Sequence, residues 1–305
     1  MKEEAVLFGE TRSLIGIMTH PRTGDGSRKP GVILLNPGIV HRVAPGRLYV
    51  KLARALAAVG CAVLRFDFSG IGDSGVRHDH LPFNKSAVRE TQDAMNWLSA
   101  TKGIEHFILL GGCSGAQVAL RTACCDARVV DAILMNFPLD EDTEGSADAE
   151  HTERSAAHYY WNFALFDLKS WRKLLTGRAS YRNIIRVLKA RAKGKLNSQK
   201  GVSAEALEFR EQLHQLAGRD TQVMFAYAQD DLSVHELREA GGDELERLRV
   251  LGRTTLKVIP RADHTFSSLF DQERLVRVIL DRLGSMTAPI VKKVRTLEQV
   301  TPSPI

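Results

Sequence analysis

The strongest constraint on the fold is a repeated alternation of continuous apolar runs with amphipathic segments across residues 31–138. The apolar runs lack polar–apolar alternation, which is typical of strands that are buried on both faces. The segments between them carry apolar residues at helical spacing. Predicted strands cover residues 31–38, 61–68, 106–112 and 129–138, and predicted helices cover residues 47–60, 86–103 and 115–125. This order predicts an α/β fold with a mostly parallel, doubly wound sheet that helices cover on both faces.

Further elements are predicted on either side of this alternation. Residues 5–21 are expected to form an antiparallel hairpin. After a long, charged and mostly helical interruption, strand-like runs return at residues 221–229 and 254–260, and a closing helix is expected at residues 267–284. The interruption therefore indicates an insertion into one α/β domain.

This reading divides the chain into three parts. The predicted core covers residues 1–138 and 219–285. The helical cap is inserted into it at residues 139–218, and a loosely held C-terminal tail covers residues 286–305. The tail is expected because its last residues are rich in proline.

The composition is that of an ordinary globular protein. Its 305 residues are 44% hydrophobic and 26% charged, which suits one large domain with an insertion. The N-terminus lacks the apolar region of a secretory signal, and no run reaches the ~18–20 apolar residues of a membrane span. We expect a soluble, cytoplasmic protein with no transmembrane segment.

The chain has four cysteines, Cys61, Cys113, Cys124 and Cys125. No CxxC pair is present, so no zinc or other metal site is predicted. Neighbouring Cys124 and Cys125 fall on different faces of a predicted helix. Reduced thiols and a reducing compartment are therefore expected, and no cofactor is predicted.

Residues 106–123, HFILLGGCSGAQVALRTA, place a small-residue turn between a predicted strand and a predicted helix. A Gly-x-nucleophile-x-Gly turn lifts one side chain above the sheet edge and aims the following amide at a substrate carbonyl. The frame from Gly111 to Gly115 makes Cys113 the nucleophile, and the frame shifted by one residue makes it Ser114. We favour Cys113 because glycine stands at both of its flanks, and Ser114 remains the alternative.

Four motifs give the chain a resemblance to the α/β-hydrolase superfamily over nearly all of the sequence outside the insertion and tail. They are LNPG at 35–38, RFDFSGIGDSG at 65–75, YAQDDLSV at 227–234 and IPRADHTF at 259–266. They are similar to the oxyanion strand ending, the Asp-x-x-Gly-x-Gly-x-Ser loop, the acid loop and the histidine loop of that superfamily. A structural turn is expected at Gly70, Gly72, Asp73 and Ser74.

More narrowly, the Cys-type elbow and the runs at residues 52–74 and 170–188 resemble bacterial hydrolases associated with exosortase and exopolysaccharide gene sets. The commonest nucleophile of the superfamily is serine. Dienelactone-hydrolase-like members also carry cysteine in this turn, so a cysteine elbow is compatible with the resemblance.

A thiol nucleophile needs a base or a positive environment, because a free thiol is mostly protonated at neutral pH. The helix that begins near Gly115 would favour the thiolate through its positive end. His264 is predicted to act as general base and then as general acid. Asp231 is predicted to orient and stabilise the imidazole, with Asp230 as the alternative acid. This chain order is the one expected for the fold.

Two backbone amides are predicted to form the oxyanion hole. One is the amide of Ser114, which follows the favoured nucleophile. The other comes from the loop after the first core strand, with Ile39 preferred and Gly38 beside it.

The insertion carries the most uneven charge in the chain. Residues 140–153 are acidic without Lys or Arg, and residues 169–200 are basic without Asp or Glu. A solvated helix face explains such a basic run, and so would an anionic surface or an acyl-carrier protein as partner. No nucleic-acid motif accompanies it, so a nucleic-acid partner is not expected. The aromatic residues Tyr159, Tyr160 and Trp161 are candidates for lining a substrate pocket, or for the core of the insertion itself.

The resulting hypothesis is an esterase or thioesterase that acts on a small-molecule acyl substrate through an acyl-enzyme. An acyltransferase that uses the same acyl-enzyme is the first alternative. A non-catalytic binding protein that retains the fold is the second.

Overall fold

The computed structural model describes residues 1–21, 29–139, 203–229, 231 and 233–298, in a chain that divides into two compact units. Met1–Leu139 and Phe209–Ile305 form one unit, and Asp140–Glu208 form the other. The candidates Tyr159, Tyr160 and Trp161 lie outside the described residues, and so does the basic segment.

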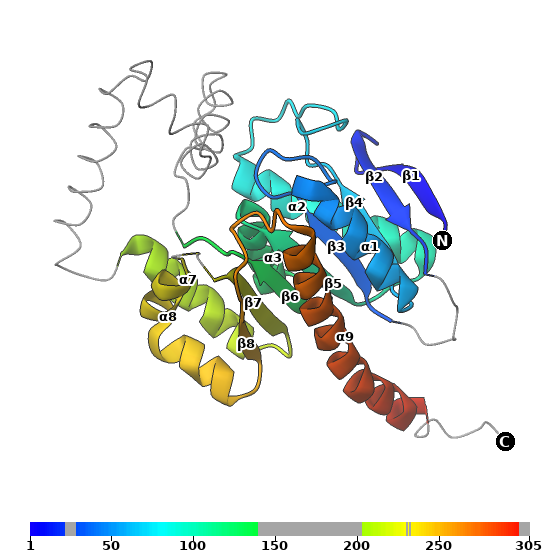
Figure 1. Ribbon diagram of the computed structural model, residues 1–305. Coiled ribbons are helices and arrows are strands. Elements are labelled where there is room, and N and C mark those ends of the chain that lie inside the picture. The colour runs from blue at the N-terminus through cyan, green and yellow to red at the C-terminus, as the bar shows by residue number, and fades with distance from the viewer. Residues whose placement is uncertain (22–28, 140–202, 230, 232, 299–305) are drawn as a thin grey trace, which may run out of the picture. The chain divides into compact units, whose positions relative to one another are not determined.

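The described elements follow the predicted order closely (Figure 1). The strands are β1 (Glu3–Phe8), β2 (Leu14–Thr19), β3 (Gly31–Leu35), β4 (Val63–Phe66), β5 (Phe107–Gly112), β6 (Val129–Met135), β7 (Gln222–Ala228) and β8 (Thr254–Ile259). The helices are the short η1 (Pro45–Arg47), α1 (Leu48–Ala58), α2 (Phe83–Lys102), α3 (Ser114–Cys125), α7 (Ala204–Ala217), α8 (Ser233–Val250) and α9 (Leu269–Glu298).

The strands form one eight-stranded sheet in the order β1-β2-β4-β3-β5-β6-β7-β8. The β1–β2 hairpin is antiparallel, and β2 also pairs antiparallel with β4. All later pairs are parallel. The predicted hairpin and the mostly parallel, doubly wound sheet are therefore confirmed, and the carboxyl ends of the parallel strands meet at one edge, where such sheets bind ligands.

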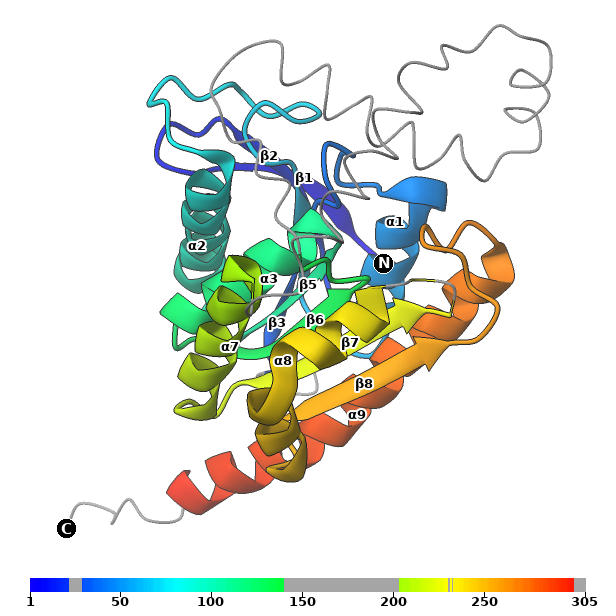
Figure 2. The same ribbon diagram turned by 90° about the vertical axis from the view of Figure 1, so that its left-hand side faces the viewer.

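Helices lie on both faces of this sheet (Figures 1 and 2). The helices α1 and α9 pack on one face, where they bury alternate strand residues such as Val32, Leu34, Ile108 and Leu110. The helices α2 and α3 cover the other face. Because both faces are covered, the central strands read as continuous apolar runs in the sequence.

The helix α9 is longer than the sequence analysis predicts. It was expected to end at residue 284, but it continues to Glu298. The prediction took the proline-rich C-terminus as a tail, whereas Pro289 lies within the helix. None of the described helices combines the length and the apolar character that a bilayer span needs.

A buried ion pair ties α9 to the amino end of β6. Asp131 is fully buried, and its carboxylate accepts hydrogen bonds from Arg282 at 3.1 and 3.2 Å. Arg282 also donates to the hydroxyl of Thr255 at the start of β8. This pair lies at the opposite edge of the sheet from the carboxyl ends of the strands, so its role is structural.

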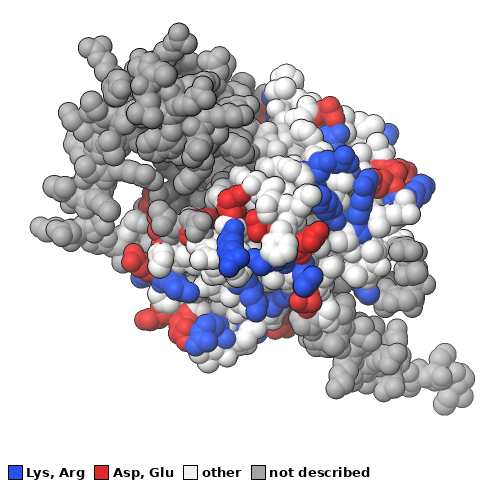
Figure 3. Space-filling view, viewed as in Figure 1, with Lys and Arg blue, Asp and Glu red and all other residues white. Residues whose placement is uncertain are grey.

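Charged side chains of both signs mix over the face of the core unit seen in Figure 3. Several of the described charges are paired, among them Arg54 with Glu3 at 2.8 Å and Arg249 with Glu246 at 2.6 Å.

Candidate active site

Cys113 stands at the sharp turn between β5 and α3. Its backbone has φ 51° and ψ −123°, a region that residues with a side chain rarely adopt. Its amide donates to the carbonyl of Met135 at the end of β6 at 2.9 Å. The strain of the turn therefore falls on Cys113, while Ser114 is already the first residue of α3.

Two glycines make this turn sterically possible. A Cβ on Gly111 would lie 2.2 Å from the carbonyl oxygen of Gly115, and a Cβ on Gly115 would lie 2.4 Å from that of Asn36. A Cβ on Gly112 would meet nothing closer than 3.5 Å. The backbone therefore requires glycine at Gly111, two residues before Cys113, and at Gly115, two residues after it.

Tyr49 of α1 stabilises the turn through hydrogen bonds of its buried hydroxyl. It is 1% exposed, and its hydroxyl donates to the carbonyl of Leu35 at 2.8 Å while it accepts from the amide of Gly112 at 3.0 Å. Burial raises the pKa of this phenol. One hydroxyl therefore joins the end of β3 to the residue before Cys113.

Asp231 and His264 meet across the carboxyl ends of β7 and β8. The carboxylate Oδ2 of Asp231 lies 2.7 Å from the imidazole Nδ1 of His264, and the Oδ1 atom accepts from the amide of Ser233 at 3.0 Å. Asp231 thus also caps the start of α8. Burial alone would raise the pKa of Asp231, but the hydrogen bonds from His264 and Ser233 and the imidazolium charge lower it overall.

His264 has two hydrogen-bond partners, Asp231 and Cys113. The hydrogen bond to Asp231 and, second, the hydrogen bond to Cys113 raise the pKa of His264 to about 10, against the opposing effect of burial. Its side chain still keeps about half of its surface exposed, at 55%. At neutral pH the imidazole therefore holds its proton between the thiol of Cys113 and the carboxylate of Asp231.

Asn136 holds the histidine loop in place, and the sequence analysis did not single it out. It is 3% exposed, and its backbone is in the left-handed region with φ 44°. Its side chain donates to the carbonyl of His264 at 2.6 Å and accepts from the amide of Ala228 at 2.8 Å. The only sequence signal is an amide residue at the end of the apolar run that forms β6.

The predicted oxyanion amides lie beside the turn. The amide of Gly38 donates to the hydroxyl of Ser114 at 2.9 Å. Within the described part of the chain, the amides of Ile39 and Ser114 make no hydrogen bond. The two amides that remain available are therefore those of Ser114 and Ile39, and Gly38 is engaged by a side chain.

The loop after β4 packs against the same region. A Cβ on Gly72 would lie 2.3 Å from a carboxylate oxygen of Asp67. The hydroxyl of Ser74 donates to the backbone carbonyl of Asp67 at 2.6 Å and accepts from the amide of Ile15 at 2.9 Å. Asp73 pairs with Arg42. These contacts give the residues of the predicted turn structural roles.

The remaining thiols are separate from this cluster. All four cysteines are unbridged, and burial raises the pKa of Cys61 to about 11 and that of Cys124 to about 12. Among the described residues, no group of three or more His, Cys, Asp or Glu side chains is arranged to hold a metal ion.

The comparisons with known proteins agree with this architecture. The model of a family described as the alpha/beta hydrolase family matches residues 32–278. The chain belongs to the alpha/beta hydrolase family. The match spans both the Cys113 turn and the Asp231 and His264 loops. No curated protein matches this alpha/beta hydrolase.

Solved structures share its fold at low sequence identity. An alpha-beta serine hydrolase homologue from Coxiella burnetii is 15% identical, with a TM-score of 0.54 over 93% of this chain and 98% of that one. The esterase Pf2001 from Pyrococcus furiosus is 16% identical, with a TM-score of 0.58 over 93% of this chain and 90% of that one. The alpha/beta hydrolase GrgF from Penicillium sp. sh18 is 17% identical, with a TM-score of 0.54 over 93% and 98%.

Proposed function

We propose that this alpha/beta hydrolase cleaves an ester or thioester of a small-molecule substrate through an acyl-enzyme on Cys113. One observation carries the proposal: the imidazole Nδ1 of His264 lies 2.7 Å from the carboxylate Oδ2 of Asp231, and a second hydrogen bond, to Cys113, helps to raise the pKa of His264. That is the arrangement of nucleophile, base and orienting acid that covalent catalysis requires.

In the proposed reaction, attack begins from the thiolate of Cys113, with the proton on His264. The sulfur forms a bond to the acyl carbon, and the carbonyl electrons move to the oxygen. As the intermediate collapses, the bond to the leaving group breaks and that group takes the proton from His264. His264 next accepts a proton from water, which attacks the acyl carbon. The bond to the sulfur breaks, the acid product leaves, and the thiolate and imidazolium are restored.

The developing oxyanion would be met by the amides of Ser114 and Ile39. Both lie next to the turn and neither is engaged within the described part of the chain. Such a donor typically lowers the barrier by about 3–4 kcal/mol. The amide of Gly38 would join them only if it released the hydroxyl of Ser114.

Two features support hydrolysis of an ester-like bond. Solved structures that share its fold include a serine hydrolase homologue and an esterase, and the exosortase-associated hydrolases that this sequence resembles share its cysteine elbow. Because one of these similar proteins is a serine hydrolase homologue, Ser114 is the rival nucleophile. The hydroxyl of Ser114, however, is engaged with the amide of Gly38, and its backbone is helical.

Turnover of p-nitrophenyl and thioester acyl donors tests the proposal. We expect wild-type hydrolysis to be abolished in Cys113→Ala and to persist in Ser114→Ala. Loss in Ser114→Ala with retention in Cys113→Ala would reverse the assignment. Products formed with added alcohols or amines, in place of free acid, would indicate an acyltransferase. No turnover and no selective labelling of Cys113 would indicate a binding protein. An acyl-carrier or anionic partner for the basic segment remains a prediction.

A further inference from the structure

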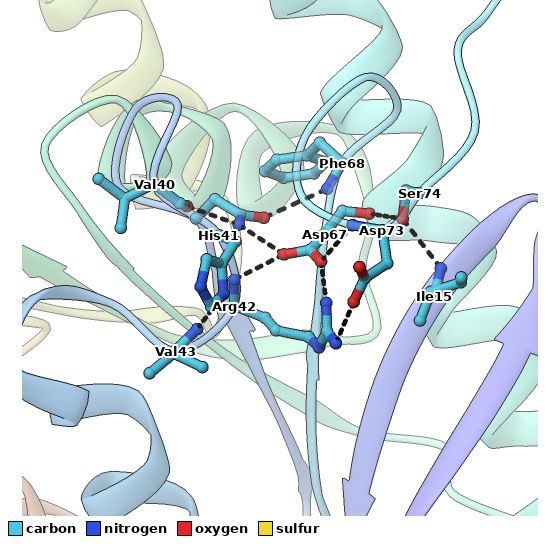
Figure 4. A network of polar contacts seen from close by, with 10 residues as sticks. Ile15, Val40, His41, Arg42, Val43, Asp67, Phe68, Asp73 and Ser74 are labelled. Atoms are coloured by element: carbon cyan, nitrogen blue, oxygen red, sulfur yellow. Dashed lines mark hydrogen bonds and ion pairs between the residues drawn. The ribbon is translucent and has the colours of Figure 1, made fainter.

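Asp67 carries a buried carboxylate that the proposed reaction does not use. It follows β4 directly and is fully buried. Its Oδ1 atom accepts from the amide of Arg42 at 2.6 Å and from the side chain of Asn36 at 3.3 Å. Its Oδ2 atom accepts from the guanidinium of Arg42 and from the amide of Asp73 at 3.3 Å. Figure 4 shows these contacts converging on one side chain.

The contacts of Asp67 fix both ends of the segment from Asn36 to Arg42, which we call the oxyanion loop. Asn36 begins the loop, and its side-chain amide donates to the carbonyl of Val40 at 2.8 Å as well as to Asp67. The side-chain oxygen of Asn36 accepts from the amide of Phe68 at 3.2 Å. Arg42 ends the loop and is bound to Asp67 through its backbone and its side chain.

The oxyanion loop also lies against the nucleophile turn. Its first carbonyl, that of Asn36, is the atom a Cβ on Gly115 would strike at 2.4 Å. Gly38 of the loop is bonded to the hydroxyl of Ser114 at 2.9 Å. A small displacement of the loop would therefore move the amide of Ile39 relative to Cys113.

Stability alone is a weak explanation for such a pair. Replacing a buried ion pair by apolar side chains is often neutral or stabilising, because desolvation offsets the attraction of the two charges. A buried carboxylate with four donors, three of them from the oxyanion loop, instead fixes the geometry of that loop. Preorganised donors are the largest single contribution to many acyl-transfer reactions.

We propose that Asp67 and Arg42 are positioning residues that hold the oxyanion loop so that the amide of Ile39 faces the acyl oxygen beside Cys113. This inference rests on the proposed function. Asp67 acts through Asn36 and the loop, and it touches neither substrate nor thiol. Its effect is therefore confined to reactions of Cys113 that build negative charge on an oxygen.

Two reactions of the same thiol separate this role from a general structural one. Alkylation by iodoacetamide forms a carbon–sulfur bond and expels iodide at a saturated carbon, so it needs no oxyanion hole. Acylation by p-nitrophenyl acetate forms an oxyanion before it expels p-nitrophenolate. The ratio of the acylation rate to the alkylation rate therefore reports the oxyanion loop, while general damage to the turn lowers both rates.

Asp131→Asn is the matched control for Asp67→Asn. Both carboxylates are fully buried and paired with an arginine whose side chain is 12–15% exposed. The pair of Asp131 with Arg282 lies at the opposite edge of the sheet. We expect Asp67→Asn to lower the rate ratio by about 10- to 1000-fold, and Asp131→Asn to leave it within about threefold.

A second variant keeps the test decisive where Asp67→Asn fails to fold. Arg42→Lys retains the charge and the backbone bond but loses the guanidinium fork, so an intermediate fall in the ratio is expected. The inference that Asp67 and Arg42 position the oxyanion loop is overturned if a variant that folds keeps the wild-type ratio of acylation to alkylation. This holds whether both rates stay as in the wild type or fall equally. A wild-type protein that is alkylated at Cys113 but never acylated contradicts the proposed function instead.

Discussion

The Oδ2 atom of Asp231 lies 2.7 Å from the Nδ1 atom of His264, although 33 positions separate the two residues in the chain. The contact engages the Nδ1 atom of the imidazole and leaves the other ring nitrogen, Nε2, for Cys113. Asp231 in turn is held by the first amide of α8. The acid is therefore positioned by its own helix as well as by the histidine.

In the proposed mechanism, this contact is expected to set the pH range of activity. The pKa of His264 is raised to about 10, so its proton, which the leaving group needs, is lost only as pH rises through that value. The alkaline limb of kcat/KM should therefore lie near pH 10. In Asp231→Asn the first cause of the raised pKa is removed, and the limb should move toward the ordinary histidine value of about 6.5.

Asp263→Asn provides the control for this pH profile. Asp263 precedes His264, but its carboxylate accepts from Thr265 and Ser267 rather than from the imidazole. The alkaline limb of kcat/KM in Asp263→Asn should therefore lie at the same pH as in the wild type. An alkaline limb near pH 6.5 in the wild-type protein would contradict the assigned role of Asp231.

The glycines of the turn should differ in their tolerance of alanine. Gly115→Ala would place a Cβ 2.4 Å from a backbone oxygen, and Gly111→Ala would place one at 2.2 Å, so each should lower the free energy of unfolding by about 1–3 kcal/mol or more. Gly112→Ala should cost less than about 1 kcal/mol. Urea unfolding of the three variants measures this. A larger loss in Gly112→Ala than in the other two would favour the frame centred on Ser114.

Tyr49→Phe should be more destabilising than the same change at a matched tyrosine. It leaves the carbonyl of Leu35 and the amide of Gly112 without their bonds. Tyr227→Phe leaves only the carbonyl of Phe137 without its bond. With about 1–3 kcal/mol for each buried group left unpaired, Tyr49→Phe should show the larger loss in urea unfolding. Equal losses would mean that the Gly112 contact contributes nothing.

Asn136 should affect turnover through the position of His264. Asn136→Ala removes both side-chain hydrogen bonds, whereas Asn136→Asp keeps an acceptor for Ala228 and loses the donor for the carbonyl of His264. We expect both variants to lower kcat by about 10- to 100-fold, in keeping with the loss of aligned acid–base catalysis, with little change in KM. A normal kcat in Asn136→Asp would show that the bond to the histidine loop is dispensable.

The sequence predicts the repetitive parts of the fold well, because buried strands and amphipathic helices leave periodic patterns. The hairpin and the parallel sheet both follow from such patterns. The end of α9 does not, because the proline-rich C-terminus reads as a loosely held tail although the helix continues to Glu298.

The support of the site is much harder to predict. Tyr49 and Asn136 each act through contacts with segments distant in the chain, and their own neighbours carry no motif that reveals those contacts. Asp67 opens the Asp-x-x-Gly-x-Gly-x-Ser loop noted in the sequence, but the motif alone does not reveal its contacts with Asn36 and Arg42. A polar residue at the end of an apolar run is the one shared hint for Asp67 and Asn136. Tyr49 reads only as one apolar position of a helix.

The most direct measurement is the mass of the covalent intermediate. Wild-type protein mixed with a p-nitrophenyl ester or acyl thioester is quenched with acid during turnover, digested and mapped by mass spectrometry. The acyl mass should lie on Cys113 and disappear in Cys113→Ala. An acyl group on Ser114, or one that still accumulates in Cys113→Ala, would contradict the central claim.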